Sequence, residues 1–476
     1  MESRIKQNPS ILPVSRTTKL FVAALAMLAF AYLLQMPSPL RLGSDSIILL
    51  SMGSSAADGH GFLYHGEATH FAPGYPVMVA FLDILGLAST RSFILLNCAF
   101  AGMALIACYR FYRKPLELSN QLSIGLCCMV MLSFVLVQLA TRPMSDVVFL
   151  GLFTLALLLI ARVRDEAGRM KWGYLGSALL LTAAAITVRT AGVALLPALA
   201  WVFGAPLLLN LDKLRKKYPV TLWGSLFGLL ISGLFCGFII SKTHYFAEMK
   251  TIYFQDGLSG RLLKNLMMHD MELGEIGFNI SADKAPHFLK QACYLSGILI
   301  IALSFRGIWL RRRSFGVLEV TLLSYGAMIF TWPYPDVRFW LPALPLMAGF
   351  IAIALIDAAK LRRFKFVGAA MCVWVAMGLA FIVHSTWVSW SAGTRFADVY
   401  AGDTMRATYQ AAYLGQTNVV EMPDDEAVRK FLNAAALESN DLNTNNVILF
   451  LKRSDTMLLL KRYDPKARSV QSRNGI

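Results

Sequence analysis

The chain of 476 residues is 56% hydrophobic and 16% charged, with a mean hydropathy of +0.55. Soluble globular proteins are about one quarter charged, so this composition excludes a soluble enzyme, a disordered protein and a secreted disulfide scaffold. It predicts a polytopic membrane protein.

The positive charge is concentrated between the hydrophobic runs. The chain has 45 Lys and Arg against 29 Asp and Glu, a formal net charge of +16. Almost all of this excess lies in six short segments: 4–19, 110–114, 162–171, 213–217, 306–313 and 360–365. Basic residues beside membrane spans mark the cytoplasmic side. The distribution therefore places these segments in the cytoplasm and argues against a nucleic-acid partner.

Hydrophobic runs of roughly 16 to 24 residues approach the length needed to cross a bilayer. Eleven spans are predicted, at about 20–36, 91–110, 119–140, 146–163, 172–187, 190–207, 219–241, 290–306, 315–331, 339–356 and 366–384. With the basic segments inside, the N-terminus is predicted in the cytoplasm and the C-terminus outside. The short run 74–89 begins Pro73-Gly74-Tyr75-Pro76, so we interpret it as an interfacial or re-entrant helix on the outer side.

The predicted fold class is an all-α polytopic membrane protein with a small extracytoplasmic α/β domain. Residues 1–384 form the transmembrane domain, in which 37–90 is a first outer loop with juxtamembrane helices and 242–289 a second large outer loop. Residues 385–476 form the extracytoplasmic domain, because an acidic helix start is followed there by an apolar, β-like run. All seven cysteines lie in predicted spans, so disulfides and outer thiolate metal sites are not expected.

Charged residues at the ends of the predicted spans share one level, the outer membrane interface. They are Asp45, Arg91, Arg142, Asp146, Arg189, Lys242, His244, Asp336 and Arg338. Each alone is compatible with an interfacial anchor, but together they favour a shared polar cavity. Guanidinium groups pair bidentately with phosphate oxygens, and a phosphate at membrane level implies a lipid-linked one. A carboxylate such as Asp45 is then a candidate general base, while the arginines stabilise a polyprenyl phosphate leaving group.

Several short motifs follow one another along the chain. They are Gly43-Ser44-Asp45, Ala56-Ala57-Asp58-Gly59-His60-Gly61-Phe62, Phe71-Ala72-Pro73-Gly74-Tyr75-Pro76, Thr141-Arg142-Pro143-Met144-Ser145-Asp146, Arg189-Thr190-Ala191-Gly192 and Arg338-Phe339-Trp340-Leu341-Pro342-Ala343-Leu344-Pro345. Their order resembles the GT-C superfamily of membrane glycosyltransferases, in particular the branch with the protein O-mannosyltransferases and the lipid A aminoarabinose transferase. The resemblance covers nearly the whole chain.

The resemblance implies roles for individual residues. Asp45 matches the catalytic base, and Arg338, Arg142 and Arg189 match positions near the lipid phosphate. Lys242 lies at the same predicted level and is a further candidate for the donor phosphate. Candidates for a second acid or for acceptor contacts are Asp58, Glu67, His60, Tyr75, Asp146 and Asp336.

No metal site is predicted and no cofactor is required. Only some relatives use a divalent ion, and the second acid of the first loop stands in no diagnostic context here. His60, His65 and His70 recur around Glu67, a spacing that does not align ligands on one helical face but that a loop can gather. Metal ligands, loop histidines and acceptor contacts therefore remain alternatives for them.

The predicted function is an inverting glycosyltransferase that moves a sugar from a polyprenyl-phosphate donor to an acceptor hydroxyl on a glycan, lipid or protein. The rivals are a lipid-linked-sugar transporter or flippase, an O-antigen-type ligase or polymerase, and a non-catalytic member of the same fold. The chain shows no internal repeat and no midplane charges, which argues against a transporter. The acid-bearing loop comes early, which argues against the ligase. Short loops favour a bacterial inner membrane, with the active site and the C-terminus on the periplasmic side.

Overall fold

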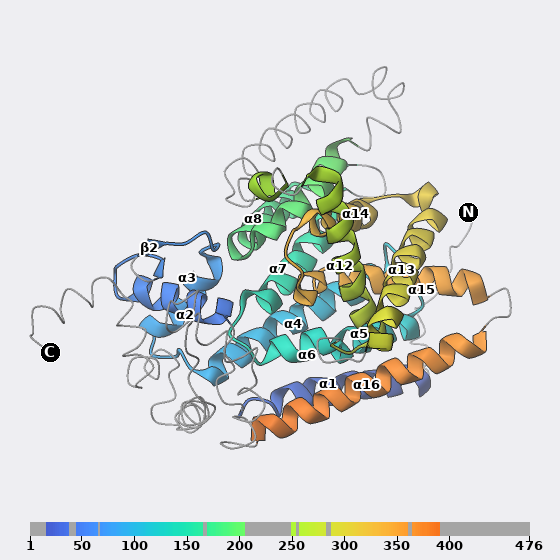
Figure 1. The fold of residues 1–476 in the computed structure, drawn as a ribbon, viewed down its shortest axis with the longest axis horizontal. Coiled ribbons are helices and arrows are strands. Elements are labelled where there is room, and N and C mark those ends of the chain that lie inside the picture. The colour runs from blue at the N-terminus through green and yellow to red at the C-terminus, as the bar shows by residue number, and fades with distance from the viewer. Residues whose placement is uncertain are drawn as a thin grey trace, which may run out of the picture.

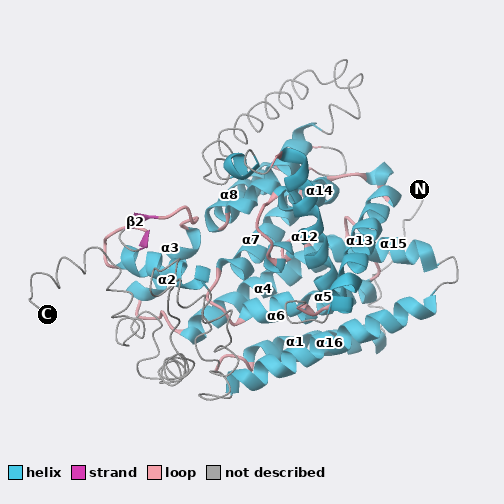
Figure 2. Cartoon of the chain, in the orientation of Figure 1, coloured by secondary structure: helices cyan, strands magenta, loops and turns pink. Residues whose placement is uncertain are grey.

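The computed structural model describes residues 16–37, 44–64, 67–164, 169–204, 249–253, 257–281, 287–359 and 364–390. In these residues the chain is mostly helical, and one short antiparallel hairpin supplies the strands (Figure 2). The predicted span 219–241, Lys242 and residues 391–476 of the predicted C-terminal domain lie outside the described residues.

The first half of the chain contains the central helices. The elements are α1 (Arg16–Leu33), α2 (Ser44–Ala57), β1 (Leu63–Tyr64), β2 (Glu67–Ala68), α3 (Gly74–Ile84), α4 (Thr90–Arg113), α5 (Asn120–Leu132), α6 (Phe134–Ala140), α7 (Ser145–Ile160), α8 (Trp172–Val188) and the 3-10 helix η1 (Thr190–Leu195). In the hairpin, Leu63 lies opposite Ala68 and Tyr64 opposite Glu67. The helices α2 and α3 lie with this hairpin at one end of the molecule (Figure 1).

The second half packs around these helices. Its elements are α12 (Leu258–Phe278), α13 (His287–Leu310), η2 (Arg312–Ser314), α14 (Val317–Thr331), η3 (Val337–Trp340), α15 (Leu344–Ala359) and α16 (Phe364–Trp390). The helix α16 lies alongside α1 (Figure 1). Ser385 Oγ donates to Gln35 Oε1 at 2.6 Å, and Trp390 Nε1 donates to the Leu34 carbonyl at 2.8 Å.

The centre of the core is α7. Nearly all of its side chains are buried, including that of Asp146 in the first turn. A helix that is apolar on all sides packs in the interior of a bundle. The ring centroids of its Phe149 and Phe153 lie 5.5 Å apart, and the Phe153 centroid lies 5.4 Å from that of Tyr325 on α14. The rigid core therefore fixes the position of Asp146.

Three of the described helices are long and apolar enough to cross a membrane: Thr90–Arg113, His287–Leu310 and Gly368–Trp390. The other described apolar helices are shorter, and the 16 residues of α7 give about 24 Å against a hydrocarbon core of about 30 Å. Eleven spans therefore remain a prediction for most of these segments.

The predicted span over 119–140 consists of two helices with a sharp bend between them. The helices α5 and α6 meet at Ser133 with a bend of 58°. Breaking a helix frees backbone groups that need partners, and Asn279 supplies them. Its Oδ1 accepts from the Phe134 amide at 2.7 Å, and its Nδ2 donates to the Leu132 carbonyl at 3.0 Å.

Candidate active site

Arg338 stands between two carboxylates. Its Nη2 lies 2.6 Å from Asp45 Oδ2, and its Nε lies 2.6 Å from Asp336 Oδ2. Asp45 comes from the first turn of α2, whereas Asp336 immediately precedes η3 and accepts the Arg338 amide on Oδ1 at 3.0 Å. The Asp45 side chain keeps 23% of its surface exposed. The site is therefore tightly paired and partly exposed.

A second ion pair lies beside the first. Arg189 follows α8 and its Nη1 pairs with Asp146 Oδ1. The guanidinium carbons of Arg189 and Arg338 lie 5.2 and 5.3 Å from the centroid of the Phe339 ring. Cations are attracted to aromatic rings at such distances, so Phe339 holds both arginines in one cluster. Tyr325 Oη donates to the Phe339 carbonyl at 2.7 Å and fixes this residue.

The neighbouring carboxylates stabilise the positive charge of Arg338. Burial opposes its positive charge, but the three carboxylates of Asp146, Asp336 and Asp45 outweigh burial and raise the pKa of Arg338 above its ordinary value. Arg338 is therefore a cation at every working pH. A guanidinium carries five N–H donors, and the two carboxylates contact two of its nitrogens. Donors remain for an incoming anion.

Arg142 lies in the turn between α6 and α7. The Asn97 side-chain amide on α4 donates to the carbonyls of Leu139, Ala140 and Arg142 at 3.4, 3.0 and 2.8 Å. This buried amide shapes the turn, and sequence reasoning did not identify it. The Nε of Arg142 is buried and has no hydrogen-bond partner among the described residues.

The motif at the start of α3 packs beside Arg189. A Cβ on Gly74 would lie 2.6 Å from the carbonyl carbon of Thr187, near the end of α8, so glycine permits this close approach. The neighbouring Tyr75 is fully buried, and its hydroxyl has no hydrogen-bond partner in the described part of the chain.

The remaining candidates from the first loop lie elsewhere. Asp58 and His60 follow the C-terminal end of α2 and are exposed. Asp45 lies at the other end of this 14-residue helix, which corresponds to about 20 Å. Glu67 lies in β2. The described residues contain no group of three or more His, Cys, Asp and Glu side chains that could hold a metal ion.

Sequence reasoning did not identify the side chains that hold the segment 331–340. These side chains belong to Tyr253, Arg261, Asn265, His269 and Glu272. We call this group the brace. Tyr253 Oη donates to the Thr331 carbonyl at 2.6 Å, Arg261 Nη2 to the Pro333 carbonyl at 2.8 Å and Asn265 Nδ2 to the Thr331 carbonyl at 3.3 Å. The His269 Nε2 lies 2.8 Å from the Trp332 carbonyl. The brace thus fixes the segment that carries Asp336 and Arg338.

His269 and Glu272 form the buried end of the brace. Glu272 Oε2 lies 2.8 Å from His269 Nδ1 and accepts from Trp340 Nε1 at 3.0 Å. Because both His269 nitrogens face acceptors, the pair is either imidazolium with carboxylate or imidazole with carboxylic acid, and it is neutral overall in both forms. Burial raises the pKa of Glu272, while His269 and Trp340 oppose this shift.

A sequence signal for the brace exists. Arg261, Asn265, His269 and Glu272 are spaced by four, four and three residues, which places them on one face of a helix. The hydrophilic composition of 242–289 predicts an outer loop, whereas the helical period of these four residues predicts a helix within it. In the structure, Arg261, Asn265 and His269 of this stripe face backbone carbonyls of the segment 331–333.

Comparison with models of known protein families gives no match, and neither does comparison with the sequences of curated proteins. Solved structures do match. ArnT from Cupriavidus metallidurans bound to undecaprenyl phosphate is 13% identical, with a TM-score of 0.44 over 94% of this chain and 74% of that chain. The archaeal oligosaccharyltransferase AglB from Archaeoglobus fulgidus, in complex with an inhibitory peptide and a dolichol-phosphate, is 12% identical, with a TM-score of 0.46 over 88% of this chain and 60% of that one.

Both of these proteins are GT-C glycosyltransferases. At 12 and 13% identity, the similarity of this chain to these two structures concerns the fold alone. It is a likeness in the course of the chain, with TM-scores below 0.5. The function proposed below therefore rests on the side chains of this protein.

Proposed function

We propose that this protein is an integral membrane glycosyltransferase that moves a sugar from a polyprenyl-phosphate donor to an acceptor hydroxyl. The observation that carries the proposal is the contact between Asp45 and Arg338, at 2.6 Å, in a partly exposed cluster with the Arg189–Asp146 pair. A carboxylate beside permanent cations provides both a base and an anion-binding group.

Arg338 and Arg189 bind the donor phosphate through N–H groups that the carboxylates leave available. Phosphate oxygens compete with Asp45 for the guanidinium group of Arg338, since guanidinium pairs bidentately with phosphate. Binding of the donor then releases Asp45 from its ion pair and leaves it able to accept a proton. Arg142 and Lys242 are proposed as further phosphate contacts.

The reaction is a single displacement. Asp45 accepts the proton of the acceptor hydroxyl, while the oxygen of that hydroxyl forms a bond to the anomeric carbon. The bond between that carbon and the phosphate oxygen breaks, and its electron pair leaves with polyprenyl phosphate, whose charge the arginines stabilise. Configuration at the anomeric carbon inverts. Because guanidinium groups neutralise the leaving group, the proposed chemistry needs no cofactor.

Asp336 is the proposed second acid. It shares Arg338 with Asp45, whereas Asp58 lies at the far end of α2. We assign Asp146 the role of holding Arg189, and we propose Asp58, His60 and Glu67 as acceptor contacts. Tyr75 supports the α3 end of the site. The proposed acceptor is a glycan, lipid or protein in the periplasm of a bacterium, with the N-terminus cytoplasmic.

The test measures release of free polyprenyl phosphate. Purified protein in nanodiscs is incubated with a panel of polyprenyl-phosphate sugars, with and without extracted cell-envelope acceptors, and the products are measured by mass spectrometry. Loss of a general base typically costs 10²–10⁴-fold, so we expect Asp45→Asn to lose about that much transfer while it still binds donor. Arg338→Ala should mainly weaken donor binding.

Asp357→Asn is the matched control, because it removes a carboxylate from a surface ion pair with Arg306. It should release polyprenyl phosphate like the wild type. Full activity of Asp45→Asn would remove Asp45 from the role of base. Donor binding without release under any condition, unchanged in Asp45→Asn, would favour a transporter instead.

A further inference from the structure

A pocket lies far from the candidate active site, at the opposite end of α7. Its volume is about 640 Å³, in the range of ligand sites. It is lined by Arg110 and Lys114 at the end of α4, Pro115, Leu158 and Ala161, Arg162 and Arg164 after α7, and Arg169, Lys171 and Tyr174 at the start of α8. Asp146 opens the 16 residues of α7, so about 24 Å separate the two sites along this helix.

The lining is strongly cationic. Six of the lining residues are Arg or Lys, and none of those that the structure describes is acidic. Asp165 and Glu166, which lie outside the described residues, would leave an excess of four positive charges even if both were counted in full. Like charges held together repel one another. A bound anion would relieve this repulsion.

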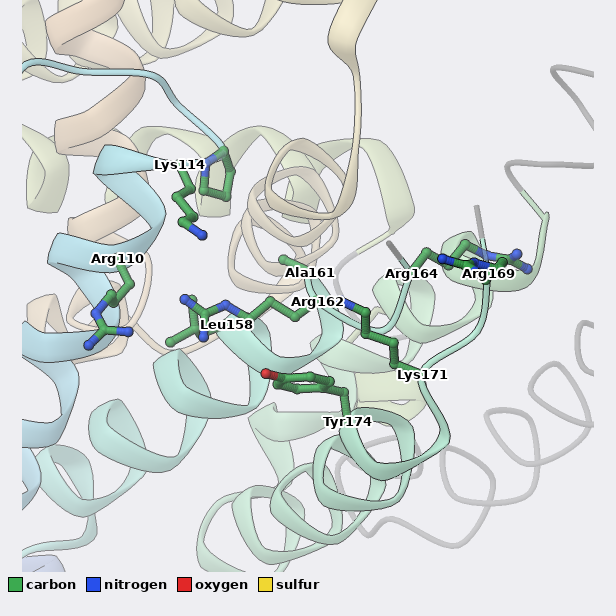
Figure 3. Close-up of a pocket in the computed structure, with 10 residues that line it drawn as sticks. Arg110, Lys114, Leu158, Ala161, Arg162, Arg164, Arg169, Lys171 and Tyr174 are labelled. Carbon is green, nitrogen blue, oxygen red and sulfur yellow. The ribbon is translucent and has the colours of Figure 1, made fainter. Parts of the chain in front are cut away.

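The pocket is built from converging elements. In Figure 3, the Arg162 side chain extends between Arg110 on one side and Tyr174 on the other, with Lys114 above it. Backbone contacts hold the turn after α7: the Lys171 amide donates to the Val163 carbonyl at 2.7 Å, and Arg164 forms a bridge with Met170. Arg164 Nε also donates to the Val202 carbonyl at 2.7 Å. The cationic groups are thus positioned by the fold.

Burial affects one of these cations. Arg164 is partly withdrawn from water, and this burial lowers its pKa from the ordinary value. A guanidinium in this environment gains more from an anionic partner than one in bulk water, because charges attract more strongly where water is excluded.

The surroundings of the pocket are apolar. Trp172, next to Lys171, is 73% exposed, Leu180 further along α8 is 72% exposed, and Ile106 on α4 is 61% exposed. Exposed tryptophan and aliphatic side chains beside basic residues are typical of a membrane interface. An anion that reaches this pocket from the bilayer would carry acyl chains that these residues contact.

We propose that this pocket binds a phosphate ester, and that the headgroup of an anionic phospholipid supplies it. Basic pockets between helices bind such headgroups in other membrane proteins. The preference for positive charge on the cytoplasmic side explains where the segments 110–114 and 162–171 lie. It does not explain why their cations converge on one pocket without an acidic lining residue among the described ones.

The experiment uses native mass spectrometry on the full-length protein in non-ionic detergent. The protein is titrated with phosphatidylglycerol, with phosphatidylcholine as the zwitterionic comparison, and with glycerol 1-phosphate as the soluble ester. Each charge-assisted contact contributes about tenfold in affinity, so the double variant Arg110→Gln/Arg162→Gln should bind phosphatidylglycerol about 100-fold more weakly. Arg162→Lys keeps the charge and should bind within about tenfold of the wild type.

Two variants separate this pocket from other basic groups. Arg312→Gln removes an exposed arginine that lies over the Trp309 ring, and Arg338→Ala disables the candidate active site. Both should bind phosphatidylglycerol like the wild type. If millimolar glycerol 1-phosphate displaces the lipid, the ester alone provides the affinity and a soluble phosphate is the source. If glycerol 1-phosphate does not displace the lipid, the phospholipid is the source of the phosphate ester. Wild-type lipid binding by the double variant, or an equal loss in Arg312→Gln, would overturn the proposal.

Discussion

Arg338 determines how the candidate site is organised at the scale of single residues. It contacts Asp45 from one part of the chain and Asp336 from another. A planar guanidinium presents donors on separate nitrogens in a fixed geometry, whereas a lysine carries all of its donors on one nitrogen. The residue type therefore matters here as much as its charge.

Asp270 makes the stability of the protein depend on pH. The side chain is buried, and its Oδ1 has no hydrogen-bond partner among the described residues. Burial raises its pKa from 3.8 to about 6. Between these two pH values the folded state binds a proton that the unfolded state has lost, so the contribution of Asp270 to the free energy of unfolding falls as the pH rises. Above about pH 6 it remains constant.

We therefore expect Asp270→Asn to be more stable than the wild type at pH 7.5 and to lose this decline between pH 4 and 6. Thermal unfolding in detergent across that pH range measures both effects. The exposed Glu117→Gln variant serves as a control and should keep the wild-type slope. An unchanged slope in Asp270→Asn would show that Asp270 titrates normally.

At the scale of elements, α12 supports the segment 331–340 through the brace. Glu272 shares a hydrogen bond with His269 and accepts one from Trp340 in the interior. Removing a buried acceptor leaves its donors unsatisfied, at a cost of about 1–3 kcal/mol each. The brace therefore couples the stability of α12 to the position of Arg338.

We expect Glu272→Ala to lower the free energy of unfolding by about 3 kcal/mol and also to weaken donor use, because Arg338 loses its support. Glu272→Gln keeps an acceptor oxygen and should retain most of both. Urea unfolding measures the stability of the two variants, and donor titration measures how well they bind the donor. If the glutamine variant fails as badly as the alanine variant, the carboxylate charge rather than its acceptor capacity supports the segment.

The packing of α12 on α13 depends on glycine. A Cβ on Gly274 would overlap the backbone carbonyl of Cys293, whereas a Cβ on Gly260 of the same helix would meet nothing within 4 Å. Overpacking typically costs about 1–3 kcal/mol, but replacing an exposed helical glycine by alanine stabilises by about 0.5–1 kcal/mol. Gly274→Ala should therefore lower the melting temperature and Gly260→Ala should raise it slightly. Equal effects would show that the two helices separate without cost.

At the scale of the whole molecule, Asn279 joins three segments. It pairs with the groups freed between α5 and α6 and donates to the Trp374 carbonyl on α16 at 3.1 Å. Its backbone has φ 56° and ψ 43°, a left-handed conformation that asparagine tolerates better than most residues.

Asn279→Ala loses these hydrogen bonds and adds backbone strain. Its free energy of unfolding should therefore be about 3 kcal/mol lower than that of the wild type. Asn279→Gly loses the same bonds without the strain and should recover about 1 kcal/mol of this. Differential scanning calorimetry of the two variants beside the wild type gives both differences. Wild-type stability in the glycine variant would mean that the three bonds contribute nothing.

The candidate active site and the basic pocket lie at opposite ends of one central helix. Asp146 begins α7, and the basic pocket surrounds its other end. Because α7 is buried along its length, a change at one end can reach the other only through the packed core.

The sequence by itself determined the class of protein, the positions of most helices and the residue types of the candidate site. These are local properties, because hydrophobic runs, basic flanks and short motifs such as Arg338-Phe339-Trp340 are contiguous in the chain. The tertiary structure decided which of these residues meet. It placed Asp336 beside Arg338 and left Asp58 a helix length away from Asp45, and it turned the hydrophilic segment before α13 into the brace. It also gathered cations from 110–114 and 162–171 into one pocket, since such convergence depends on how helices pack and not on the spacing of residues along the chain.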